Sequence, residues 1–227
     1  MSQTYSSSAR YAHPKFRNVA LPAAALIGVN IVLMYLVAVT PLAAVNNLLF
    51  SIPILGLIVY GAALTGGNIL AERGLESGSM GTAAAGVLLL EGAYALFGGG
   101  ILARAPRDLQ GIALAVALVV TVAMTIAIAA YVYLRDREFD HWSSWSLGAF
   151  IIGAVFVLIG SFVTIALLAG FVFIFAGFML RLGYEIWHVR ASYDADTPLV
   201  HAVGIYVAFT GVFVHVLQIA LRVLSDR

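Results

Sequence analysis

The sequence predicts an all-α membrane protein, a bundle of seven transmembrane helices, and three observations support this. Hydrophobic residues make up 62% of the 227 residues and charged residues only 10%, whereas soluble domains carry roughly 25% charged residues. The mean hydropathy is +1.00. Several apolar runs also reach about 20 residues, the length that a helix needs to cross a bilayer. The lipid bilayer is therefore the first partner that we expect.

Seven apolar runs are long enough to span a membrane, and short polar connections separate them. We therefore expect one membrane domain over residues 19–223, a cytoplasmic N-terminal tail over 1–18 and a short C-terminal tail over 224–227. The connections leave no room for a separate soluble domain. The predicted spans are Val19–Thr40, Val45–Leu70, Gly81–Ala103, Gly111–Leu134, Leu147–Phe162, Ile165–His188 and Leu199–Val223.

The boundary between the fifth and sixth spans follows from length. The 34 residues from Leu147 to Leu180 contain no charge. One straight helix of that size would be about 51 Å long, against a hydrocarbon core of about 30 Å. We therefore expect a tight turn near Gly160 and Ser161.

The distribution of lysine and arginine predicts the orientation. With the N-terminus inside, 8 of the 12 basic residues lie on the cytoplasmic side and 4 on the other, as the positive-inside rule favours. A six-span arrangement gives the same division, so the number of spans rests on length alone.

Composition also excludes several classes of function. The net charge of +1 and the absence of a basic cluster argue against a nucleic-acid partner. Because the chain has no cysteine, it has no disulfide, thiolate metal site or cysteine nucleophile. The polar N-terminus lacks the apolar core of a secretory signal.

Glu91 lies near the middle of the third predicted span, within LLLEGAYALF. A charged carboxylate there costs at least about 2.5 kcal/mol, so it must be protonated, paired or facing water. One interpretation is a group that handles protons or cations. The other is a neutral carboxyl that bonds a neighbouring helix, and the sequence does not separate the two.

Arg181 and Glu185 end the sixth apolar run, in FAGFMLRLGYEIWH. Residues four apart share a helix face and can pair. The pair is either an anchor at the membrane interface, beside Trp187, or a gate at the inner mouth of an ion pathway.

The histidines of the last two spans do not form a recognisable cofactor site. His201 and His215 lie 14 residues apart on one predicted helix, but bis-histidine haem needs partners from other helices, and only His188 is available. Glu185 and His188 have the spacing of one metal-ligand pair, where such sites need several. The only lysine, Lys15, precedes the first span and could not bind retinal. We expect no metal, no cofactor and no catalytic site.

The last five spans resemble the Bax inhibitor (transmembrane Bax inhibitor motif) family. LLLEGAYAL is similar to the glutamate–glycine step of that family's third helix. REFDHWSSWSLGAFIIGAVFVLIGSF resembles its polar connection and glycine-rich fifth helix. FAGFMLRLGYEIW and then HAVGIYVAFTGVFVHVLQIALRVL are similar in layout to its sixth and seventh helices. The resemblance covers Gly81 to the C-terminus.

The resemblance implies a seven-helix bundle with a central C-terminal helix. It also implies calcium leak controlled by a proton-sensitive latch of two aspartates. At the first latch position this chain has Leu182, or Glu185 if the register shifts by three residues. At the second it has Ala208, so neither aspartate is present as such.

We therefore hypothesise a gate rebuilt from other residues at the inner mouth. Antiparallel helices would put Glu185 near Gly204 or Ile205, and His188 near His201. Glu91 and His215 would lie deeper along the pathway. Calcium prefers six to eight oxygen ligands, so a leak of protons or weakly selected cations such as calcium fits these residues better than calcium selectivity.

Two functions remain open at this point. The leading one is a proton-linked or weakly selective cation leak in a prokaryotic plasma membrane, and the alternative is a non-conducting protein that acts through protein or lipid contacts. A Glu185 side chain that faces the bundle axis would favour the leak, and one that faces lipid headgroups would favour the alternative.

Overall fold

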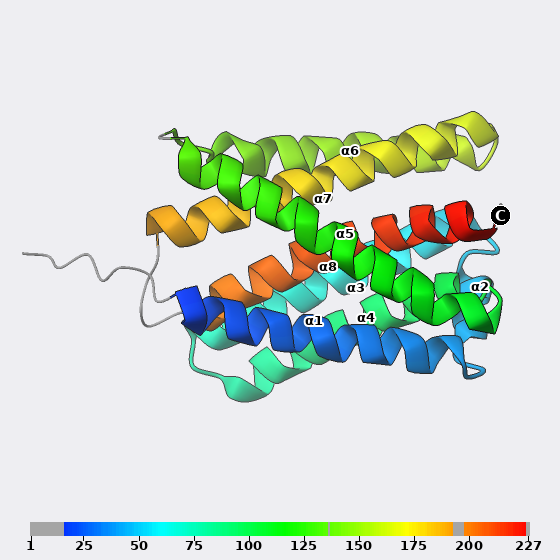
Figure 1. The fold of residues 1–227 in the computed structure, drawn as a ribbon, viewed down its shortest axis with the longest axis horizontal. Helices are drawn as coiled ribbons and strands as arrows, with labels where there is room; N and C mark the ends of the chain where they lie inside the picture. Colours follow the sequence, from blue (N-terminus) through cyan, green and yellow to red (C-terminus); the bar gives the residue numbers. More distant parts are fainter. Residues whose placement is uncertain (1–15, 136, 193–197, 226–227) are drawn as a thin grey trace, which may run out of the picture.

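The computed structural model describes residues 16–135, 137–192 and 198–225, and within them the chain forms eight α-helices and no strand. Seven of these helices are long and apolar enough to cross a membrane, as predicted. They run roughly along the long axis of the molecule (Figure 1). The helices are α1 (Phe16–Ala38), α2 (Ala43–Leu49), α3 (Pro53–Glu76), α4 (Met80–Leu102), α5 (Arg107–Leu134), α6 (His141–Gly160), α7 (Thr164–Ser192) and α8 (Pro198–Ser225).

Most of the predicted N-terminal tail (1–18) and part of the predicted C-terminal tail (224–227) lie outside the described residues. The first helix begins at Phe16, earlier than the predicted residue 19. The end of the bundle where α1 begins also holds the end of α7 and the start of α8 (Figure 1, left). We call it the N-terminal end.

The predicted division of the long uncharged segment is confirmed. Helix α6 ends at Gly160, and α7 begins at Thr164. The two helices pack closely because small residues face each other across the contact. A Cβ added to Gly170 would lie 3.1 Å from the carbonyl oxygen of Gly153, so backbone meets backbone there, as is usual in lipid.

Several predicted boundaries were wrong because polar residues extend the helices beyond the apolar runs. Helix α6 starts at His141, ahead of Leu147, and α7 continues to Ser192, past His188. Backbone groups at a membrane interface still gain from helical hydrogen bonds, whatever the polarity of their side chains.

The predicted span Val45–Leu70 was also wrong, because two helices occupy this region. The short α2 ends at Leu49, and α3 starts at Pro53 and continues to Glu76. A proline at a first helical position has no backbone N–H to lose from the helix. Pro53 therefore starts a new helix after the turn at residues 50–52.

Helix α8 lies at the centre of the bundle, as the family resemblance implied. It contacts α1, α3, α4, α5 and α7 (Figure 1). In its most apolar stretch 67% of the residues are buried, against 17% in the peripheral α6. Small residues at Gly204, Ala208 and Gly211 leave room on α8 for side chains of the surrounding helices.

Candidate functional site

Arg181 and Glu185 form an ion pair on the last turns of α7. One turn separates them, and Arg181 Nη2 lies 2.6 Å from Glu185 Oε1. The two side chains differ in burial, with 32% of the arginine exposed and only 5% of the glutamate. The guanidinium also lies 5.3 Å from the centre of the Tyr184 ring. The carboxylate therefore points inward, and the arginine covers it from the outside.

Glu185 faces the central helix and not the lipid headgroups. A Cβ built on Gly204 of α8 would collide with Glu185 Oε2 and would lie 2.7 Å from its Cδ. This confirms the predicted level of Glu185 beside Gly204. The carboxylate occupies the space that the missing side chain of Gly204 leaves free.

His188 and His201 meet one turn closer to the N-terminal end. Their ring centres are 5.2 Å apart and the rings are nearly perpendicular, at 82°. This contact between α7 and α8 was also predicted from the antiparallel alignment. His201 is buried, and His188 is half-buried against the ring of Tyr184 at 5.4 Å.

Two acidic residues that sequence reasoning missed, Glu72 and Asp140, interact electrostatically with these α7 side chains. Glu72 of α3 interacts electrostatically with Glu185 and His188, and it accepts a hydrogen bond of 2.8 Å from Asn68. Asp140, just before α6, interacts electrostatically with His188. In the predicted arrangement both acids lie in polar connections on the same side of the membrane as the end of α7. That shared side was the available signal.

We call Glu72, Arg181, Glu185, His188 and His201 the N-terminal cluster. It holds both signs of charge on α3 and α7, which each contact α8. The ion pair lies within α7, and His201 is the member from α8, so a change in the charge of the histidines would alter the electrostatic interaction between α7 and α8 there.

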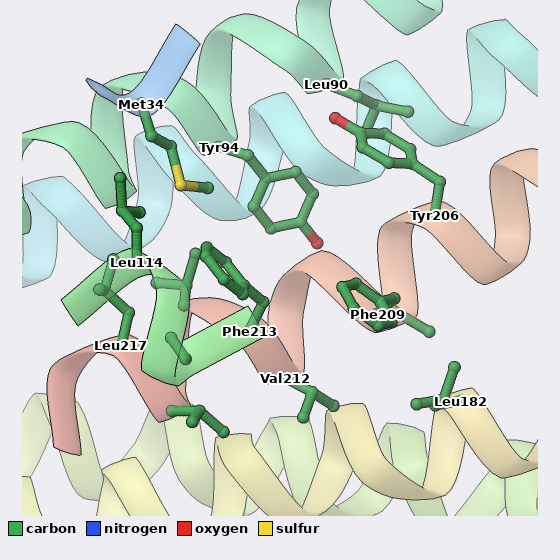
Figure 2. Packing of buried hydrophobic residues seen from close by; sticks show 14 of the residues in the cluster. Met34, Leu90, Tyr94, Leu114, Leu182, Tyr206, Phe209, Val212, Phe213 and Leu217 are labelled. Carbon is green, nitrogen blue, oxygen red and sulfur yellow. The ribbon is translucent and has the colours of Figure 1, made fainter. Parts of the chain in front are cut away.

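In the register without a gap, the two positions that match the family latch are apolar and packed. Leu182 and Ala208 are both fully buried, at 0% exposure. Figure 2 shows Leu182 of α7 in one cluster with Phe209 and Val212 of α8. A hydrophobic contact therefore occupies the level where the latch is expected in that register, and the Glu185 carboxylate lies about one turn away on α7.

His215 lies away from the N-terminal cluster, in an aromatic surround. The ring centres of Phe171, Phe175 and Phe178 lie 4.9, 5.7 and 5.7 Å from the centre of its imidazole. Its Nδ1 lies 2.8 Å from the carbonyl oxygen of Gly211, one turn earlier on α8. The structure does not bring His215 together with the other predicted gate residues.

Glu91 belongs to a second polar cluster, which α1, α4 and α8 form together. The amide nitrogen of Asn30 donates a hydrogen bond of 2.6 Å to Glu91 Oε2 and one of 3.2 Å to the Tyr206 hydroxyl. All three residues are buried. Sequence reasoning missed Asn30 and Tyr206, because only the packing of α1 and α8 on α4 brings them to Glu91.

Among the described residues, no group of three or more histidines, aspartates or glutamates could hold a metal ion. A family model described as "Inhibitor of apoptosis-promoting Bax1" matches residues 17–225. This match extends over the first two spans as well, which the quoted motifs did not cover. Comparison with curated proteins and with solved structures found no match.

Proposed function

Because the chain belongs to the Bax inhibitor family, we propose that this multi-pass membrane protein mediates a leak of protons or weakly selected cations, with the contact between α7 and α8 at Glu185 as its gate. The main support is the position of Glu185, which is buried and faces the backbone of the central helix at Gly204. An interfacial anchor would instead extend its carboxylate towards water.

The proposed gate responds to charge. When Glu185 loses its charge, its attraction to Arg181 falls, and the partly exposed arginine can turn towards water. When His188 and His201 gain charge, they repel each other across the same contact. The first change frees the Glu185 side chain beside Gly204, and the second pushes α7 away from α8. Together they open this contact on acidification. Glu72 and Asp140 interact electrostatically with His188, and their negative charges partly offset the repulsion between the two charged histidines.

The proposal does not include calcium selectivity. Calcium binds six to eight oxygens, and Glu72 and Glu185 are the acids that the N-terminal cluster offers. We further propose that the N-terminus is cytoplasmic, on the basis of the 8 to 4 distribution of basic residues. The short connections suggest a prokaryotic plasma membrane, by analogy.

A non-conducting role in protein or lipid contacts is the second candidate. The observation that favours it is the full burial of Leu182 and Ala208 at the family latch positions. An apolar contact there does not change with pH, so it would keep the bundle closed under all conditions.

Flux measurements separate the two candidates. The purified chain is placed in liposomes that contain a proton or calcium dye, and flux is followed from about pH 5 to about pH 8. We expect more flux at low pH. Glu185→Gln, which removes the charge, should keep the flux high at both ends of this range.

Glu76→Gln is the matched control, because Glu76 is an exposed acid at the end of α3. It should behave as the unmodified chain does. Flux no higher than in empty liposomes at every pH would refute the leak and favour the non-conducting role. A pH response that Glu185→Gln leaves intact would refute the gate.

A further inference from the structure

We propose that Asn30, Glu91 and Tyr206 form an exchangeable site for one monovalent cation, which is taken up as a proton or as Na⁺. This central cluster involves α1 and α4, which contribute nothing to the N-terminal cluster. The inference does not depend on the proposed leak and is tested without measuring flux.

The central cluster lies deep in the bundle. Asn30 and Glu91 are near the middles of α1 and α4, and Tyr206 comes from the central α8. The exposed fractions are 0% for Asn30 and Tyr206 and 4% for Glu91. Figure 2 shows Tyr206 and Tyr94 extending from α8 and α4 into the packed interior.

The oxygen acceptors outnumber the donors in this cluster. The two N–H groups of the Asn30 amide are shared among three acceptors, Glu91 Oε2, the Glu91 carbonyl oxygen and the Tyr206 hydroxyl. Within the described residues, Asn30 Oδ1 and Glu91 Oε1 have no hydrogen-bond partner. The hydroxyl of nearby Tyr94 donates instead to the carbonyl oxygen of Val207, at 2.8 Å. The Tyr206 hydroxyl also interacts with the Glu91 carboxyl, but within the described residues Asn30 Oδ1 and Glu91 Oε1 still have no hydrogen-bond partner.

The charge of the central cluster is also unbalanced. The groups that interact with the Glu91 carboxyl are Asn30 from α1 and Tyr206 from α8, and neither carries positive charge. Across the described ranges, α3, α5 and the rest of α4 bring no lysine, arginine or histidine to it. Its own helix adds only Tyr94, whose ring meets Tyr206 edge-on at 6.1 Å.

One cation would correct both deficits. A bridging water could donate to the two free oxygens, but it would leave an ionised Glu91 uncompensated in hydrocarbon, which is costly. A proton or Na⁺ brings the positive charge as well. Carboxylate, amide and hydroxyl oxygens are suitable ligands for a hard cation. These two ions share that chemistry, so experiment must separate them.

Two measurements on the detergent-solubilised full chain test the site. The first is the midpoint of thermal unfolding in NaCl and in choline chloride at equal ionic strength. The second is the infrared difference spectrum between about pH 5 and about pH 9, which reports the carbonyl stretch of a protonated carboxyl. The variants are Glu91→Gln and Asn30→Leu, with Glu76→Gln as the control on an exposed acid.

If Na⁺ occupies the site, NaCl should raise the midpoint of the unmodified chain and of the control, and both variants should reduce or lose this shift. If a proton alone occupies it, Na⁺ has no effect, but the spectrum contains a pH-dependent carboxyl band that Glu91→Gln removes. If Glu91→Gln does not fold, Asn30→Leu still tests the site, because it removes one ligand oxygen and keeps the carboxyl.

A spectrum with no pH-dependent carboxyl band attributable to Glu91, together with no Na⁺ effect, would overturn the proposal. Glu91 would then be a permanently neutral carboxyl that joins α1, α4 and α8. Since neither readout measures transport, this failure is distinct from a failure of the proposed gate.

Discussion

Gly204→Ala should destabilise the chain, because it places a methyl group where the Glu185 carboxylate lies. The new Cβ would collide with Oε2 and would lie 2.7 Å from Cδ and 3.2 Å from Oε1. The Glu185 side chain is only 5% exposed and is tied to Arg181. It cannot move aside without breaking that pair or separating α7 from α8.

The expected size of the effect combines three contributions. Overpacking a tight contact costs about 1–3 kcal/mol. Disturbing an ion pair whose arginine is partly exposed costs up to about 1 kcal/mol more. Alanine recovers about 1 kcal/mol through its better helix propensity. We therefore expect the free energy of unfolding to fall by up to about 3 kcal/mol.

Unfolding can be followed in detergent by tryptophan fluorescence, since the chain has three tryptophans and no cysteine for a thiol dye. Gly61→Ala is the control, because a Cβ on Gly61 meets nothing within 4 Å. Glu185→Ala supplies a second background in which the colliding atoms are gone, so there Gly204→Ala should cost nothing. If Gly204→Ala matched the control in both backgrounds, Glu185 would not pack against α8.

Two further predictions concern packing and capping. Gly86→Leu should lower the free energy of unfolding by about 3 kcal/mol or more, because a side chain at Gly86 would meet the backbone of Ala71 on α3. An unchanged free energy of unfolding would contradict this close approach. Arg190→Ala should cost about 1–2 kcal/mol and speed hydrogen exchange in the last turn of α5, because Arg190 Nη1 donates to the carbonyl oxygens of Val132 and Arg135 at 2.9 and 3.2 Å; unchanged exchange there would show that these bonds do not hold that turn.

The spans could be predicted from the sequence because lipid leaves few alternatives to an apolar helix of the right length. Even the turn after Gly160 followed from length alone. Helix α2 could not be found by hydropathy, since Val45 to Leu70 reads as one apolar run. Pro53, inside that run, was the local sign of a helix start.

The two polar clusters differ in how far they could be predicted. Arg181 and Glu185 are local neighbours on one helix, and the contact of His188 with His201 follows from two consecutive antiparallel helices. Asn30 is different. A single asparagine in an apolar run has no local signature, and its pairing with Glu91, 61 positions later, exists only because α1 packs on α4.

The central position of α8 has a consequence for biogenesis. The ribosome produces α8 after the other spans, yet α8 contacts five of them. Until α8 is inserted, Asn30 and Glu91 have no contact with Tyr206. Helix α7 likewise cannot pack against Gly204. The earlier spans therefore cannot reach their final packing during synthesis. We expect the nascent bundle to stay open beside the insertion machinery, and to close in one late step when α8 enters from the side.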